Sequence, residues 1–565
     1  MNIPPTDHNA WLDQYLRMLA RLFERQPGDF PLDALTADLR DAWRRAFTCW
    51  QAAPDRYAAV QEQWQSALLQ FHHSVSANHT QPLTALADLQ HLHRELGSCL
   101  RTMVRGAPGL SDSDQRLLGF GVRHLLNALA PEHWPLANQE VLMTAIATNG
   151  ASFTQGLRNF SLDVADSVAG LDVKTAARDD FVLGETLAAT AGEVVFENDL
   201  FQLLQYYPCT QEVLPVPLLI VPPWINKYYV LDLNPADSFV QWAVRQGHTV
   251  FIMSWVNPDA SHADLGLADY LVRGCLEAAT VVARLSGSRR LNVAGYCIGG
   301  FLAACAAAYL AAGNQHNIAS LTLVNAMLDY SEPGDIGVFL SERMLTALED
   351  HLQAQGILDG RIMRQAFTML REDKVFWPYV VNNYWLGKSP EPNPVLFWNR
   401  DATNLPRRML TEFLRDMYRH NALRNSDNYF LAGRAIDLNR ITVPVYALAC
   451  RNDHIIPWRS AFNSTLMLAG EVTFVLSDAG HVMGVVNPPN KKLSGYWNAA
   501  AGIGATDADT WLAKAARHEG SWWPHWQTWI AGRQSGQVAA RFPGADGNRI
   551  IERAPGRYVK IRSDI

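Results

Sequence analysis

One short stretch constrains the fold of this chain more than any other segment. The apolar run 291–294 ends at Gly295, and an alanine-rich, helix-forming segment begins a few residues later. Between them the chain reads Gly-Tyr-Cys-Ile-Gly-Gly over positions 295–300, with Cys297 at the centre of the turn. This is the layout of a nucleophile elbow, G-x-S-x-G in its usual form, with a thiol in place of the serine hydroxyl. Neighbouring glycines allow a strained backbone, and the N-terminus of the following helix favours negative charge on the nucleophile.

Taken alone, a glycine-flanked cysteine is more often a buried structural residue than a nucleophile. The segments around this stretch decide between the two. From about residue 181, short β-rich apolar runs alternate with helical ones. The runs expected to form strands are 216–221, 248–255, 291–294, 320–326, 443–450 and 472–476. Such alternation implies right-handed crossovers and a mainly parallel sheet covered by helices on both faces. We therefore expect an α/β-hydrolase fold, the setting in which a nucleophile elbow occurs.

Changes of pattern along the chain suggest the domain boundaries. Residues 9 to about 170 read as mostly helical, beginning with an aromatic and aliphatic stripe that starts at Trp11. We therefore expect a helical N-terminal domain over residues 1–180 and an α/β-hydrolase-like catalytic domain over residues 181–565. Between about 331 and 438 the alternation gives way to an aromatic and amide-rich segment. An insertion there, on the side where the nucleophile emerges, is expected to form a cap or lid.

Two further residues complete a candidate catalytic trio with Cys297. In an α/β-hydrolase the nucleophile comes first along the chain, the acid second and the histidine last. Asp453 follows the expected strand 443–450, and His481 follows the expected strand 472–476. The carboxyl ends of parallel strands lie at one edge of the sheet, where ligands and catalytic groups gather. Residue type, order and strand-end placement thus agree for Cys297, Asp453 and His481.

Three neighbouring residues are rival candidates for the acid and the base. His454 lies in the loop expected to carry the acid. Asp329 follows the preceding strand of the sheet, which is where some sheets of this kind place the acid. Asp478 has the setting of a turn residue. We favour His481 and Asp453 over these three.

The chemistry expected of the trio follows from the acidity of a thiol. A free thiol has a pKa of about 8.5, so little of it is thiolate at neutral pH. His481 can take the proton of Cys297 as a general base. Asp453 can orient His481, or help it to deprotonate a second, incoming nucleophile. The backbone N–H of Ile298, together with one from the loop containing Ile225, would form the oxyanion hole.

The choice of cysteine over serine indicates the type of reaction. A thiol that attacks a thioester forms another thioester, so the acyl group stays activated for an alcohol or an amine. A hydrolase gains little from this, because water is its acceptor. We therefore expect acyl transfer from a thioester such as one of coenzyme A, with the lid excluding water.

Composition and charge exclude several other classes. The formal net charge of −7 and the absence of a broad basic stretch argue against nucleic acid as a partner. The 7 cysteines are scattered and show no C-x-x-C spacing, so we expect neither a disulfide framework nor a metal site, and a reducing compartment. No apolar run reaches the roughly eighteen residues that a membrane span requires. The N-terminal residues lack the pattern of a signal peptide, and we expect a cytoplasmic protein.

Several sequence blocks resemble one family of enzymes. Residues 295–300 resemble the lipase-like box of the polyhydroxyalkanoate synthases, in which cysteine replaces serine. Further blocks similar to that family are 196–206, 222–235, 247–259, 397–406, 453–458 and 520–526. The similarity extends from about residue 190 to the C-terminus and is vaguer before that point. The overall pattern resembles the class I synthases of the family.

The resemblance implies an activity and a set of roles. It implies polymerisation of (R)-3-hydroxyacyl groups, with short groups such as 3-hydroxybutyryl favoured, from their coenzyme A thioesters into a storage polyester. Coenzyme A is released, and no cofactor is needed beyond the one that the substrate carries. By the same resemblance Cys297 is the acylated nucleophile, His481 its base, Asp453 the promoter of attack by the 3-hydroxyl, and Trp398 a substrate-binding aromatic residue.

The resemblance also bears on partners and location. It implies a homodimer that works on a growing polyester chain at the surface of cytoplasmic polymer granules, with granule-associated proteins as neighbours. Two alternatives stay open from the residues themselves. One is a thioesterase or polyester depolymerase of the same fold, and the other is a non-catalytic granule scaffold.

Overall fold

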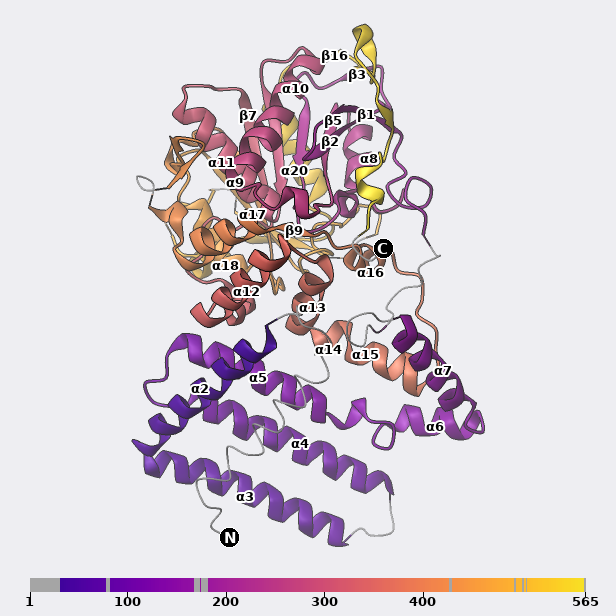
Figure 1. Cartoon of the computed structure of the whole chain (residues 1–565), viewed down its shortest axis with the longest axis vertical. Coiled ribbons are helices and arrows are strands. Elements are labelled where there is room, and N and C mark those ends of the chain that lie inside the picture. The colour runs from indigo at the N-terminus through magenta and orange to yellow at the C-terminus, as the bar shows by residue number, and fades with distance from the viewer. Residues whose placement is uncertain are drawn as a thin grey trace. The chain divides into compact units, whose positions relative to one another are not determined.

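The computed structural model describes residues 31–77, 82–166, 173, 181–425, 429–491, 494–499, 502–504 and 506–562 (Figure 1). The helical stripe predicted from Trp11 onward lies outside these residues. The chain forms two compact units, each built from separate stretches of sequence. A helical unit comprises Met1–Ala177, Asp335–His351 and Gln365–Pro392, and a catalytic unit comprises Arg178–Gly334, Leu352–Arg364 and Asn393–Ile565.

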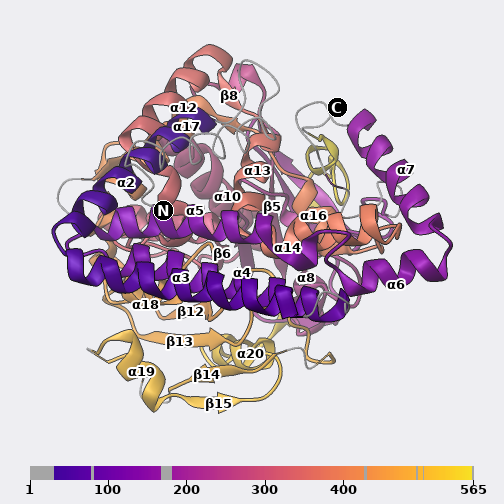
Figure 2. The same cartoon turned by 90° about the horizontal axis from the view of Figure 1, so that it is seen from below.

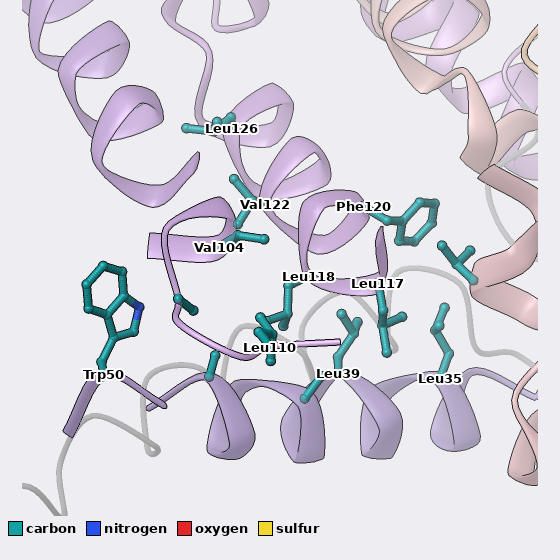
Figure 3. Packing of buried hydrophobic residues seen from close by; sticks show 14 of the residues in the cluster. Leu35, Leu39, Trp50, Val104, Leu110, Leu117, Leu118, Phe120, Val122 and Leu126 are labelled. Atoms are coloured by element: carbon teal, nitrogen blue, oxygen red, sulfur yellow. The ribbon is translucent and has the colours of Figure 1, made fainter. Parts of the chain in front are cut away.

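The helical unit is organised around a core of aliphatic side chains. Its N-terminal helices are α2 (Leu32–Gln51), α3 (Pro54–Ala77), α4 (Pro82–Arg105), α5 (Asp112–Leu129), α6 (Gln139–Ala147) and α7 (Ala151–Asp166). Figure 3 shows Leu35 and Leu39 of α2 pointing toward Leu117 and Leu118 of α5. Leu35 and Leu39 lie four residues apart and therefore share one face of their helix. A Cβ at Gly121 would lie 2.9 Å from Leu39 Cδ2, so the two helices approach closely.

Two stretches of the expected insertion belong to this helical unit. They hold η6 (Gly334–Phe339), most of α12 (Glu342–Gln355), part of α13 (Gly360–Leu370), α14 (Glu372–Val375), α15 (Trp377–Tyr379) and η7 (Val380–Trp385). Val338, Met344 and Leu370 are buried in the same core as α2 and α5. Arg343 also bonds Asp38 of α2 at 2.8 Å. The sequence placed the whole of 331–438 with the catalytic domain, whereas the structure divides it between the units.

The catalytic unit is built on an 11-stranded sheet in the order β15-β14-β13-β12-β7-β6-β4-β5-β2-β1-β17. Its parallel centre consists of β4 (Leu218–Val221), β5 (Val250–Trp255), β6 (Leu291–Tyr296), β7 (Ile318–Val324), β12 (Val445–Cys450) and β13 (Val472–Ser477). The antiparallel flanks are β1 (Gly192–Glu197), β2 (Phe201–Tyr206), β14 (Tyr496–Asn498), β15 (Ala516–His518) and β17 (Glu552–Arg553). Figure 2 shows β13, β14 and β15 side by side at one edge.

Helices cover both faces of this sheet. Every residue of β4, β5, β6 and β12 is buried, as is typical of parallel strands enclosed on both sides. The covering helices include α8 (Phe239–Arg245), α10 (Glu277–Ser286), α11 (Ile298–Ala312), α18 (Trp458–Thr465), α19 (Ala508–Lys514) and α20 (Trp523–Ala531). Figure 1 shows α10 and α11 lying over the strands. The predicted parallel, doubly covered sheet is confirmed.

The register of the strands brings three loops to one edge. Tyr296 at the end of β6 pairs with Val324 at the end of β7, and Val324 pairs in turn with Leu448 of β12. Cys450 at the end of β12 pairs with Ser477 at the end of β13. Because these strands are parallel, the loops that follow β6, β12 and β13 leave the sheet on the same side.

Candidate active site

The turn between β6 and α11 has the geometry of a nucleophile elbow. Cys297 has φ 55° and ψ −124°, a left-handed backbone that is rarely adopted by a residue with a side chain. A Cβ at Gly295 would lie 2.5 Å from the Cα of Gly300, so only glycine fits there. A Cβ at Gly299 would lie 2.1 Å from the carbonyl oxygen of Val221, which ends β4. The glycines therefore let the start of α11 pack directly against the strand end beside it.

The structure brings His481 and Asp453 together below this turn. His481 Nδ1 donates to Asp453 Oδ2 at 2.6 Å. The other carboxylate oxygen of Asp453 accepts the backbone N–H groups of Ile455 at 2.8 Å and Ile456 at 2.9 Å. Both oxygens are thus held, and the carboxylate fixes the orientation of the imidazole ring. Cys297 lies close enough to His481 for its charge to raise the pKa of the imidazole. Because Nδ1 is occupied by Asp453, Nε2 is the ring nitrogen left for the sulfur.

Neighbouring charges determine the protonation of His481. Burial by itself lowers the pKa of this imidazole, because it disfavours the charged ring. The Asp453 carboxylate, the Cys297 thiolate and their hydrogen bonds to the ring outweigh burial and raise the pKa of His481 to about 10. A raised pKa favours the imidazolium, which is the form that stabilises a neighbouring thiolate. His481 is therefore placed and charged to act as the proton partner of Cys297.

Two of the rival acids are engaged elsewhere. Asp329 Oδ1 accepts from Asn421 Nδ2 at 2.8 Å and from the N–H of Ser331 at 3.0 Å. Burial raises the pKa of Asp329, but these hydrogen bonds outweigh it and hold the pKa below its usual value. Asp478 lies 3.5 Å from the guanidinium of Arg517. Among the residues that the structure describes, the carboxylate that bonds His481 is that of Asp453.

The predicted oxyanion residues lie in the segments named for them. Ile298 is the first residue of α11, where backbone N–H groups have no partner within the helix. Ile225 lies in the loop after β4, whose first carbonyls pack against Gly299. The cap residue Thr403 holds this loop: its hydroxyl donates to the carbonyl of Trp224 at 2.6 Å. The donor role of the two N–H groups remains a prediction.

Trp398 has a structural contact of its own. It lies in α16 (Pro394–Arg400) and is buried. Its indole N–H donates to the carbonyl of Lys227 at 2.7 Å, which ties α16 to the loop after β4. A part in substrate binding stays a prediction for this residue.

Aromatic side chains that the sequence analysis did not single out gather in the part of the catalytic unit that holds the buried Cys297. Cys297 and His481 are only 5% and 6% exposed. Burial raises the pKa of Tyr418, and the charge of Cys297 adds to this effect. Tyr418 lies on η8 (Phe413–Arg419) and packs edge-on against Tyr330, with ring centroids 4.8 Å apart.

Phe413 links this aromatic cover to the rest of the site. Its ring centroid lies 5.3 Å from that of Phe301 on α11 and 5.8 Å from that of Trp224 in the loop after β4. The same ring contacts Tyr418 at 5.7 Å. We call Phe413, Tyr418 and Tyr330 the aromatic cover. Such residues on a helical segment are usually ordinary core, so no sequence pattern distinguished them.

Comparisons with known proteins identify the family. Residues 76–243 match the family described as the N-terminus of poly-beta-hydroxybutyrate polymerase (PhaC), and residues 216–488 match the alpha/beta hydrolase fold. The chain is 40% identical over 461 residues to the poly(3-hydroxyalkanoate) polymerase subunit PhaC of Rhizobium etli, covering 82% of this chain and 72% of the relative. For the corresponding subunit of Cupriavidus necator, the identity is 40% over 452 residues, covering 79% and 75%. This chain belongs to the poly(3-hydroxyalkanoate) polymerase family.

Membership confirms the resemblance and the fold class, and it makes the chain an enzyme of the acyltransferase type. The match also extends back to residue 76 in the helical unit of the polymerase, where the sequence resemblance to the family was weaker. Within the described stretches of the polymerase, no three His, Cys, Asp or Glu side chains gather as a metal ion would require. None of the helices in those same stretches is long and apolar enough to cross a membrane.

Proposed function

We propose that this polymerase joins (R)-3-hydroxyacyl groups from their coenzyme A thioesters into a polyester, with Cys297 carrying the acyl group. The observation that carries the proposal is the hydrogen bond between Asp453 and His481, with Cys297 close enough to influence the charge of the imidazole, at the elbow of a polymerase-family chain. A cysteine there suits transfer better than hydrolysis, because the acyl-enzyme is itself a thioester.

In the first step Cys297 is acylated. Its thiolate attacks the thioester carbonyl, and the oxyanion that forms is stabilised by the N–H groups of Ile298 and of the loop at Ile225. The bond between the carbonyl carbon and the coenzyme A sulfur breaks. The proton held on His481 passes to the departing sulfur, and coenzyme A leaves as its thiol.

In the second step the 3-hydroxyl of another hydroxyacyl unit attacks the Cys297 thioester. His481 takes the hydroxyl proton, and Asp453 stabilises the imidazolium that results. The new oxygen ester forms while the bond to Cys297 breaks, and the thiolate–imidazolium pair is restored. Exchange of a thioester for a more stable oxygen ester makes this direction favourable.

Access to Cys297 would require movement of the aromatic cover. A coenzyme A thioester is far larger than the opening that a 5% exposed sulfur offers. Closure of Phe413, Tyr418 and Tyr330 over an acylated sulfur would then keep water away from it. Large rings close to the sulfur also support a preference for short acyl side chains.

The other implications of the resemblance enter as part of the same proposal. We expect a homodimer that resides in the cytoplasm on polyester granules, with granule-associated proteins nearby. Trp398, with its buried position on α16, is expected to act near the substrate through the loop at Lys227 that it anchors.

Product analysis tests the proposal. With 3-hydroxybutyryl-coenzyme A, we expect release of coenzyme A together with a turbid, chloroform-soluble polymer, and neither from Cys297→Ala. A thioesterase would instead release free 3-hydroxybutyrate. Loss of existing polymer mass would indicate a depolymerase. A scaffold would give no product, and its granule association would be the same with Cys297→Ala.

A further inference from the structure

The backbone carbonyl of His481 is held by two buried side chains from neighbouring strands. Asn325 Nδ2 donates to this oxygen at 2.8 Å, and the hydroxyl of Tyr296 donates to it at 3.3 Å. Asn325 is 0% exposed. The ring of Tyr296 also lies against the imidazole, with centroids 5.4 Å apart. The loop after β13 is thus held in place at His481, the residue expected to act as the general base.

The backbone at Asn325 places its amide there. β7 ends at Val324, and Asn325 adopts φ 46°, a left-handed conformation that asparagine tolerates better than most residues. Its N–H donates to the carbonyl of Leu448 on β12 at 2.7 Å. The N–H of Cys297 donates to the carbonyl of Val324 at 2.8 Å. One short turn therefore joins the elbow, the end of β7 and β12.

The amide of Asn325 is not fully satisfied in this position. Its Oδ1 is buried and has no hydrogen-bond partner among the described residues. Burying an unpaired polar atom costs free energy, so a buried amide with an unpaired oxygen is usually retained for the interactions of its NH₂ group. Here the remaining part is the NH₂ group, which donates to the His481 carbonyl.

We propose that Asn325 is a positioning residue for catalysis. By fastening the His481 carbonyl, it keeps the imidazole where Nδ1 meets Asp453 and the ring also reaches Cys297. A catalytic base displaced by a fraction of an ångström loses much of its effect, because proton transfer depends steeply on geometry. The kinetic part of this inference rests on the proposed function, whereas the coupling of His481 to Cys297 can be measured without any acyl substrate.

Two variants at Asn325 remove the donor in different ways. Asn325→Asp keeps the shape and loses the NH₂ group, and Asn325→Gly keeps the left-handed backbone and loses the whole side chain. Tyr296→Phe removes the longer of the two bonds to the carbonyl. The matched control is Ser320→Ala, which removes a buried bond of 2.7 Å to Asn292 at the opposite ends of the same two strands.

Steady-state kinetics with 3-hydroxybutyryl-coenzyme A should separate positioning from structure. We expect both Asn325 variants to lower kcat by about 10- to 100-fold while KM stays within about twofold. Tyr296→Phe should lower kcat by only about two- to fivefold, because its bond is longer. Ser320→Ala should keep the native kcat and KM.

Alkylation of Cys297 by iodoacetamide at a fixed pH near 7 gives the second readout, followed on its peptide by mass spectrometry. The alkylation rate reports how well His481 can take the proton of the thiol. In the Asn325 variants we expect this rate to fall by about tenfold. In Ser320→Ala we expect the native rate.

The outcomes divide clearly. Folded Asn325 variants with native kcat and a native rate of Cys297 alkylation would overturn the inference. So would variants whose activity falls only in proportion to the fraction unfolded, measured by circular dichroism. If the native protein fails to release coenzyme A, the proposed function fails, while the rates of Cys297 alkylation in the native chain and its variants still test Asn325.

Discussion

His481 Nδ1 and Asp453 Oδ2 lie 2.6 Å apart, and the side chain of Asp453 is completely buried. Because the second oxygen of Asp453 is held by two backbone N–H groups, the carboxylate cannot rotate away from the ring. The base of the site is therefore oriented before any substrate arrives, and the predictions below concern what each neighbour adds.

Asp453→Asn should separate acylation from chain growth. The amide keeps the size of the carboxylate but removes the charge that stabilises an imidazolium during attack by the 3-hydroxyl. We expect acylation of Cys297 to survive within about tenfold and elongation to slow by about 100-fold. Intact-mass measurement after a short incubation should detect the acyl-enzyme, and its absence would contradict this division of roles. Asp478→Asn, which removes a carboxylate 3.5 Å from Arg517, is the control.

Cys297→Ser should abolish polymer formation rather than convert the chain into a good hydrolase. A serine hydroxyl is far less acidic than a thiol, so the same imidazole cannot hold it as an anion. We expect coenzyme A release to fall by at least about 100-fold. Thiol release measured colorimetrically provides the test, with the exposed Cys209→Ser as control. Native-like polymer yield from the serine variant would refute the assigned role.

Phe413→Ala should open the aromatic cover. Its ring packs against Phe301 and Trp224, so truncation removes contacts on two sides of the site. We expect faster labelling of Cys297 by a bulky maleimide, and a higher ratio of free 3-hydroxybutyrate to polymer because water gains entry. The control is Phe430→Ala, since Phe430 belongs to the same insertion but is 59% exposed. Unchanged labelling and an unchanged product ratio would show that Phe413 does not shield the sulfur.

His248 should make the catalytic unit less stable in acid. Burial lowers the pKa of its imidazole to about 4, although the hydrogen bond to Gln527 opposes this. Above the unfolded pKa of about 6.5 the ring is neutral in both states; below it only the unfolded chain takes up the proton. Stability should therefore fall as the pH drops from about 6.5 toward 4, by up to about 3 kcal/mol.

A denaturation series at several pH values measures this effect. His248→Gln removes the titrating group and should give a flatter dependence of unfolding free energy on pH between 7 and 4. Equal pH dependence in the native and variant chains would contradict the assignment. His518→Gln offers a comparison at an exposed histidine of the same unit.

Much of the site could be predicted because its signals are local. The run around Cys297 combines a strand, a glycine turn and a helix within a few residues, and Asp453 and His481 each follow an apolar run directly. Strand order was not needed to place them, because the carboxyl ends of all parallel strands share one edge. The choice of His481 over His454 rested on a different argument, because His454 also follows an apolar run but lies in the loop expected to carry the acid.

The remaining features depend on contacts between distant parts of the chain. Asn325 looks like any polar residue at a strand end, and only the three-dimensional structure shows that its amide reaches His481. Phe413 and Tyr418 lie on a short helical segment, where aromatic residues are usually ordinary core. The aromatic and amide-rich pattern of 331–438 indicated an insertion, but such a pattern does not say which part of the chain the insertion will pack against.

The division of the insertion changes how a shortened chain should be understood. Val338, Met344 and Leu370 share their hydrophobic interior with α2 and α5, although they follow Cys297 in the sequence. A fragment that begins at residue 178 would lack the partners of these side chains and would expose them as an apolar surface. Low solubility or low activity of such a fragment would then reflect aggregation through this exposed apolar surface. It would not show whether the first third of the polymerase takes part in the reaction.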